Sequence, residues 1–193
     1  MTAARFLFIA LMFASLALSA TAADLRSIDV DREKGRIIVV SETYFDAPLG
    51  AVFDILADYD GFQRISEVFS ETRYLERDTE GNGVVYTRAE GCVLFFCKTI
   101  ERVEKLTLMP GTEILAVAIP EQSDVSYSVA RWTFETEGNG TRVYYAMEFE
   151  PSFWVPPVLG EMILRSKLRN KGRIAADRVE ELANTAASEN AAP

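Results

Sequence analysis

Residues 125–150 have the sequence VSYSVARWTFETEGNGTRVYYAMEFE and decide the fold class of this chain. Two runs in which apolar and polar side chains alternate flank the turn-forming letters EGNG, a pattern typical of an antiparallel β-hairpin. The alternation extends back to residue 69, interrupted only by short turns. It predicts a strand meander with strands at 69–77, 84–92, 97–106, 112–120, 125–136 and 141–150.

Helical patterns lie on both sides of this meander. A first hairpin is predicted at 25–30 and 37–45, and two short helices follow near Pro48 and Gly61. After the meander, a long amphipathic helix over 158–183 has apolar residues at helical spacing, namely Leu159, Met162, Ile163, Ile174, Val179 and Leu182. This order predicts an α+β fold in which a curved antiparallel sheet wraps around a C-terminal helix and leaves an apolar cavity between them.

The pentapeptide Thr-Glu-Gly-Asn-Gly occurs twice, at 79–83 and at 136–140, each time before a run of β-forming residues. The two copies resemble an internal repeat. Asn and Gly tolerate the positive φ angles of tight hairpin turns, so turn chemistry alone explains both copies. We therefore predict two hairpin turns.

The first residues have the features of a secretory signal peptide. Arg5 supplies a positive charge, residues 6–18 an apolar core and residues 20–22 an A-x-A cleavage pattern. The apolar core is shorter than the roughly 20 residues that a membrane-spanning helix needs. We expect a signal peptide over 1–22, an exported and periplasmic domain over 23–183, and a disordered tail rich in Ala, Ser and Asn over 184–193.

The composition argues against several classes of function. The chain has a formal net charge of −9, and an acidic surface repels phosphate backbones, so no nucleic-acid partner is expected. It has no histidine, which removes the Ser-His-Asp and Cys-His catalytic systems and the usual zinc ligands. The sequence contains no carboxylate pair singled out by spacing and no phosphate-binding glycine loop. We expect neither a metal nor a redox cofactor.

Cys92 and Cys97 are the only cysteines, and an exported protein favours a disulfide between them. On one continuous strand they would lie too far apart to bond, so the disulfide requires a turn at 93–96. The alternative is a pair of free thiols in the core. The apolar turn suits a lip of the cavity or a loop that touches a membrane, and a tip folded back into the core is the third interpretation.

Four segments resemble the START-like (SRPBCC) superfamily of polyketide cyclases and coenzyme-Q-binding proteins: 46–60 (DAPLGAVFDILADYD), 132–134 (WTF), 140–145 (GTRVYY) and 154–157 (WVPP). Their order and spacing cover the chain from about 37 to 182. The resemblance implies a helix-grip fold whose cavity, beneath the C-terminal helix, binds lipids, sterols, quinones or polyketides. Only some branches of the superfamily catalyse a reaction.

Strand alternation suggests which residues line the cavity. In the last strand, Val143, Tyr145, Met147 and Phe149 share one face, and the apolar set should face the helix. The candidate ligand-binding residues are Phe53, Phe62, Tyr86, Arg88, Trp132, Phe134, Val143, Tyr145, Met147 and Met162.

Three of these candidate assignments have alternatives. If Tyr86, Arg88 and Glu90 face inward, a buried Arg–Glu pair would anchor an oxygen atom of the ligand; the alternative, which the odds favour, is that this pair faces solvent. Phe53 and Phe62 could gate the opening or belong to the core. Met162 suits core filling or an adaptable pocket.

Basic residues alternate along the closing helix, at Arg165, Lys167, Arg169, Lys171 and Arg173. Their spacing distributes them over several faces, which favours a solvated surface. A site for an anionic headgroup or a membrane surface is the second interpretation.

These observations together predict a binding or transport protein for a hydrophobic small molecule, in transient contact with a membrane if the apolar turn touches one. The first alternative is a cofactor-free cyclase or dehydratase, which would need a polar cavity with a perturbed carboxylate. The second is a module that docks on another protein.

The signal-peptide assignment predicts that the mature chain begins at Ala23 and fractionates without the membrane. N-terminal sequencing and intact mass of the protein from its own compartment check this. An intact Met1 on membrane-retained protein would contradict it.

Overall fold

The structure is a computed structural model that describes residues 22–93, 96–155 and 161–190. Residues 1–21, most of the predicted signal peptide, lie outside this range. The elements are β1 (Asp24–Glu33), β2 (Arg36–Phe45), α1 (Leu49–Ala57), η1 (Tyr59–Arg64), β3 (Phe69–Arg77), β4 (Gly83–Val93), β5 (Phe96–Met109), β6 (Glu113–Ala118), η2 (Pro120–Gln122), β7 (Val125–Glu137), β8 (Gly140–Pro151) and α2 (Glu161–Asn190).

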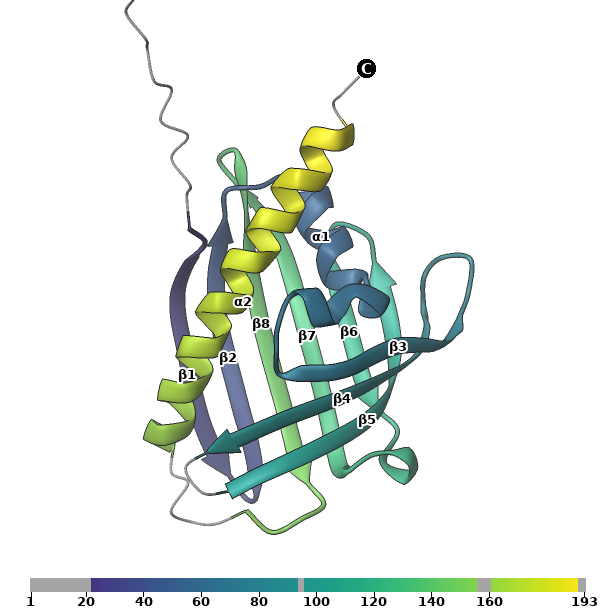
Figure 1. Cartoon of the computed structure of the whole chain (residues 1–193), viewed down its shortest axis with the longest axis vertical. Helices are drawn as coiled ribbons and strands as arrows, with labels where there is room; N and C mark the ends of the chain where they lie inside the picture. The colour runs from purple at the N-terminus through teal and green to yellow at the C-terminus, as the bar shows by residue number, and fades with distance from the viewer. Residues whose placement is uncertain (1–21, 94–95, 156–160, 191–193) are drawn as a thin grey trace, which may run out of the picture.

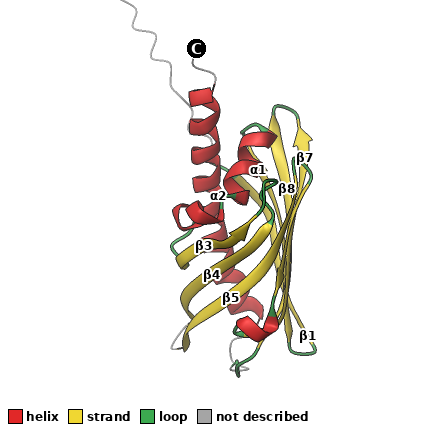
Figure 2. Cartoon of the chain, turned by 90° about the vertical axis from the view of Figure 1, so that its right-hand side faces the viewer, coloured by secondary structure: helices red, strands yellow, loops and turns green. Residues whose placement is uncertain are grey.

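The eight strands form one antiparallel sheet in the order β1-β2-β8-β7-β6-β5-β4-β3. The first hairpin, the meander and both short helices are confirmed. The sheet curves around α2 (Figure 1), and α1 and α2 lie on the same side of β7 and β8 (Figure 2). This is the helix-grip arrangement, with an open sheet rather than a closed barrel. No helix in the described part of the chain is both long and apolar enough to cross a membrane.

Both copies of Thr-Glu-Gly-Asn-Gly form hairpin turns, as predicted. The first joins β3 to β4 and the second joins β7 to β8. The central glycine has a positive φ in each copy, 88° at Gly81 and 60° at Gly138, a conformation that other residues adopt only with strain. The shared pentapeptide therefore reflects shared turn geometry.

The concave face of the sheet holds the apolar core. Val143, Tyr145, Met147 and Phe149 of β8 all belong to or pack against it, which confirms the predicted phase of this strand. The core continues onto α1 through Val52 and Leu56, and onto α2 through Ala176, Val179 and Ala183.

Helix α2 extends beyond the predicted end of the domain, as far as Asn190. The expected disordered tail is therefore wrong for residues 184–190. Two local features of this segment cannot be predicted from composition. The Asn184 side chain donates a hydrogen bond of 3.0 Å to the Asp46 carbonyl. The hydroxyls of Thr185 and Ser188 also donate to carbonyls one turn earlier, at 2.8 Å each.

A buried carboxylate fixes α2 to the rest of the fold. Glu180 is only 3% exposed, and its Oε2 accepts a hydrogen bond of 2.7 Å from the backbone N–H of Asp46, in the turn between β2 and α1. Such a charge-assisted bond in a dry environment is stronger than a neutral one. It holds the C-terminal half of α2 over α1.

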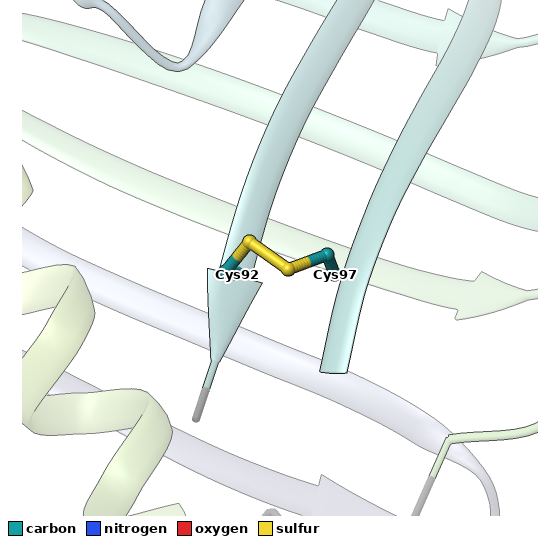
Figure 3. Close-up of a disulfide and its surroundings, with 2 residues drawn as sticks. All are labelled: Cys92 and Cys97. Atoms are coloured by element: carbon teal, nitrogen blue, oxygen red, sulfur yellow. A yellow bond between two sulfur atoms is a disulfide. The ribbon is translucent and has the colours of Figure 1, made fainter. Parts of the chain in front are cut away.

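The disulfide between Cys92 and Cys97 is present (Figure 3). The two residues face each other across the β4–β5 pair, with Cα atoms 4.0 Å apart. The predicted disulfide across a hairpin is therefore confirmed. Two residues of the predicted apolar turn, 94–95, lie outside the described residues.

We predict that Glu180→Ala lowers the free energy of unfolding by about 2 kcal/mol, because the charge-assisted hydrogen bond to the Asp46 N–H is lost. Glu181→Ala is the matched control, because Glu181 is exposed and pairs only with Arg178 at the surface. Its effect should stay within about 0.5 kcal/mol. Urea unfolding of both variants measures the difference, and equal effects would contradict the anchoring role.

Candidate functional site

A cavity of about 280 Å³ lies between α2 and the concave face of the sheet. This volume is close to the lower end of the roughly 300–1,000 Å³ that is typical of ligand pockets. Apolar side chains make up most of its wall. The sheet contributes Val39, Trp132 and Val143, η1 and the turn after it Phe62 and Ile65, and α2 Leu168 and Val179.

Small residues on α2 leave the space for this cavity. Gly172, Ala175 and Ala176 line it. A Cβ atom added at Gly172 would meet only Leu25 Cδ2 at 3.8 Å and Ile28 Cδ1 at 4.0 Å, which is ordinary contact. A larger side chain at this position would extend into the cavity.

An ion pair joins α2 to the turn between η1 and β3 at the rim of the cavity. Lys171 Nζ lies 3.4 Å from Glu67 Oε2, and both side chains are largely exposed. Lys171, Ser66 and Val68 line the cavity, so this pair lies where the cavity meets solvent. A solvated pair of this kind is weak and can open easily.

Tyr145 supplies the main polar group of the inner wall. Its ring lies 4.8 Å from the ring of Trp132, centroid to centroid. Its hydroxyl donates to Met147 Sδ at 2.9 Å, and a thioether sulfur is only a weak acceptor. Burial raises the pKa of Tyr145 to about 12, so the hydroxyl keeps its proton at neutral pH. This group can donate to a better acceptor on a ligand.

A buried Arg–Glu pair lies near Tyr145, but on β5 instead of β4. Arg102 Nη1 is 3.5 Å from Glu104 Oε1, with side chains 13% and 1% exposed. Thr87 donates to Glu104 at 3.5 Å, and Arg102 donates to Ser128 at 3.4 Å. The charges of this pair act on the Tyr145 hydroxyl, and burial raises the pKa of neighbouring Tyr59 well above its usual value.

The candidates Tyr86 and Arg88 lie on the outer face of the sheet, away from the cavity. Arg88 pairs with Glu90 and Glu101 at 3.3 and 3.9 Å, and Tyr86 packs against the Arg73 guanidinium. Their placement in a ligand site is corrected, and the solvent-facing alternative for Arg88 and Glu90 holds. The physical reason is the pleat: Val85 and Thr87 occupy the inward positions of β4.

The other candidates divide between cavity and core. Phe62, Trp132, Val143 and Tyr145 line the cavity. Phe53 and Phe134 pack together in the core with ring centroids 5.2 Å apart, so Phe53 is no gate. Met147 lies behind Tyr145, and Met162 is 83% exposed, which excludes both proposed roles for Met162.

Several wall residues on β1, β2 and α2 were not predicted from the sequence. Leu25, Val39 and Thr43 line the cavity together with Gly172 and Ala175. The alternation of residues 37–45 could have predicted the wall residues of β2, because Val39 and Thr43 share a face with Phe45.

A family described as polyketide cyclase, dehydrase and lipid transport matches residues 36–184 of the sequence. The chain belongs to this family. No curated protein matches the chain. Membership in the polyketide cyclase and lipid transport family confirms the class of function expected from the sequence, the binding of a hydrophobic small molecule.

Solved structures agree with this assignment at the level of the fold. The Zhui aromatase/cyclase from Streptomyces sp. R1128 is 16% identical, with a TM-score of 0.60 over 82% of this chain and 99% of its own. A START superfamily protein from Mycobacterium smegmatis is 15% identical, with a TM-score of 0.61 over 75% and 98%. Human STARD10 is 10% identical, with a TM-score of 0.58 over 84% and 75%.

We predict that Tyr145→Phe changes how stability depends on pH. The phenol ionises near its ordinary pKa of 10 in the unfolded chain and near 12 in the fold, so stability is present below pH 10 and is lost as pH rises toward 12. Between about pH 9 and about pH 11, the wild type should lose about 1.4 kcal/mol more unfolding free energy than the variant. Urea unfolding at both pH values measures this difference. Equal losses of unfolding free energy in the wild type and the variant would contradict the burial of the Tyr145 hydroxyl.

Proposed function

We propose that the protein binds a single lipid-like molecule in the cavity between α2 and the sheet, as a carrier or reservoir. The observation that carries this proposal is the cavity itself, about 280 Å³ of space bounded almost entirely by apolar side chains. Burying the apolar surface of a ligand there stabilises the complex by roughly 25 cal/mol per Å².

The Tyr145 hydroxyl would receive the polar end of the ligand. It donates at present to the weak acceptor Met147 Sδ, and a carbonyl or ether oxygen would accept the same proton better. The ring of Trp132 beside it offers a flat apolar surface. The favoured ligand is therefore mainly hydrocarbon or aromatic, with at least one hydrogen-bond acceptor.

The size of the cavity sets how a longer ligand would fit. A molecule larger than about 280 Å³ would extend past the Lys171–Glu67 pair toward solvent, or would require α2 to move. The first route breaks only a weak surface ion pair, whereas the second also separates Leu164 and Leu168 from β1 and β2. The rim is therefore the proposed path of entry.

Binding is favoured over catalysis by the chemistry of the wall. A cyclase or dehydratase needs an acid or base beside its substrate. No acidic side chain occurs among the described residues that line this cavity. With a pKa of about 12, the Tyr145 hydroxyl stays protonated near neutral pH and is a poor base. Catalysis by a polyketide cyclase-type reaction remains the alternative for this family.

We place this activity in an exported compartment, the periplasm. The disulfide between Cys92 and Cys97 supports this location, because such bonds persist in oxidising compartments. The signal-peptide pattern in residues 1–22 supports it independently.

Two substitutions at one position test the proposal. Gly172→Leu should place a side chain in the cavity and weaken binding of the neutral apolar probe N-phenyl-1-naphthylamine by at least about tenfold. Gly172→Ala is the matched control, since its methyl group meets only ordinary contacts and binding should stay within about twofold. Both changes favour the helix, and circular dichroism of the two variants checks that a loss of binding is not caused by unfolding.

Fluorescence titration of the probe and mass spectrometry of lipids co-purified with the native protein provide the two measurements. Equal binding by all three proteins, or none by the wild type together with no co-purified lipid, would contradict the proposal. Turnover of a polyketide substrate by the wild type would favour the cyclase alternative.

A further inference from the structure

Two exposed apolar side chains flank the connection between β8 and α2. Trp154 is 72% exposed and Met162 is 83% exposed, the highest values among the large exposed apolar side chains of the described chain. An exposed Trp is unfavourable in water, and its amphipathic ring suits the boundary between water and lipid headgroups. These two residues mark one end of the molecule as different from the rest of its surface.

The tip of the β4–β5 hairpin lies at the same end (Figure 1). The rings of Phe96 at this tip and Phe153 beside Trp154 are 6.4 Å apart, centroid to centroid. Lys98 Nζ lies 4.9 Å from the Phe153 ring. Aromatic and basic side chains from two separate segments therefore meet at one end of the fold.

The first half of α2 adds positive charge to this end. Residues 162–173 include no acidic residue and five basic ones, Arg165, Lys167, Arg169, Lys171 and Arg173, in a chain whose net charge is −9.

Part of this charge has no carboxylate partner among the side chains that the structure describes. Arg165 lies 3.5 Å from Asp29, and Lys171 pairs with Glu67. Among the described side chains, no carboxylate lies within 4.0 Å of Lys167, Arg169 or Arg173.

Helical spacing places three arginines and an exposed apolar side chain on the same side of α2. Arg165, Arg169 and Arg173 follow Met162 by three, seven and eleven residues, so the four side chains lie along one side of α2. The partly buried side chains of Leu164 and Leu168 pack against β1 and β2 instead.

We propose that this end of the molecule docks on the surface of an anionic lipid bilayer. Trp154 and Met162 would enter the headgroup region, and Arg169 and Arg173 would lie over the lipid phosphates. A folded protein partner would not require this combination of an exposed Trp with a one-sided row of arginines, whereas a charged bilayer attracts both. The docking goes beyond the proposed ligand binding and does not depend on it.

Vesicle flotation of the full mature chain tests the docking. The wild type should float with phosphatidylcholine vesicles that contain one quarter phosphatidylglycerol, remain unbound with pure phosphatidylcholine, and be released by high salt. Arg169→Gln combined with Arg173→Gln should weaken binding about 25-fold, from about fivefold for each basic residue at an anionic surface. Trp154→Ala should weaken it as well.

The matched control removes the same charge elsewhere. Lys105→Gln combined with Arg178→Gln changes exposed residues on β5 and on the second half of α2, and binding should stay within about twofold of the wild type. Circular dichroism checks that all variants fold. Failure of the wild type to bind, equal binding to neutral vesicles, or equal losses in the two double variants would each overturn the proposal.

Fluorescence gives a second measurement. The chain has two Trp residues, so in a Trp132→Phe background the emission reports Trp154 alone. Its emission should shift to shorter wavelength with anionic vesicles, and an unchanged spectrum on bound protein would overturn the insertion of Trp154. The apolar probe of the Gly172 test is not used, so the two tests have separate readouts.

Discussion

The structure depends on one constraint: a single curved sheet with an apolar concave face must be covered on that face. A flat sheet could be covered by several helices, but in the described part of the chain this cover consists of one long helix, α2, and the short helices α1 and η1. A helix is about 10 Å wide and cannot fill the whole concavity. The space that remains beside it is bounded by the same apolar residues that stabilise the fold, so folding and the formation of a ligand cavity have the same physical origin.

Strand phase was predictable where one face of a strand is clearly more apolar than the other. In β8, apolar residues alternate with charged ones, and the inward set was identified correctly. In β4, Val84 and Val85 are adjacent and place one Val on each face, so the sequence alone could not assign the inward set. The pairing of β4 with β5 assigns the inward set, because Val85 and Thr87 lie opposite Glu104 and Arg102.

The buried ion pair shows the same limit. An inward Arg–Glu pair was one of the two alternatives for Arg88 and Glu90, whereas Arg102 and Glu104 have that environment. Both pairs have the spacing of two that puts side chains on one face of a strand, and no local property distinguishes them. The wall contributed by α2 was also missed, since small residues such as Gly172 and Ala175 mark a cavity only once the distance to the opposite wall is known.

Gly172 divides α2 into two halves with different attachments. Beyond it, Val179, Glu180 and Ala183 are buried against the core, whereas before it Leu164 and Leu168 are only partly buried. Glycine within a helix lowers its stability by about 1 kcal/mol relative to alanine. The half nearer Trp154 is therefore held by the weaker packing and should separate from the sheet at the lower cost in free energy, while the half beyond Gly172 keeps α2 attached to the core.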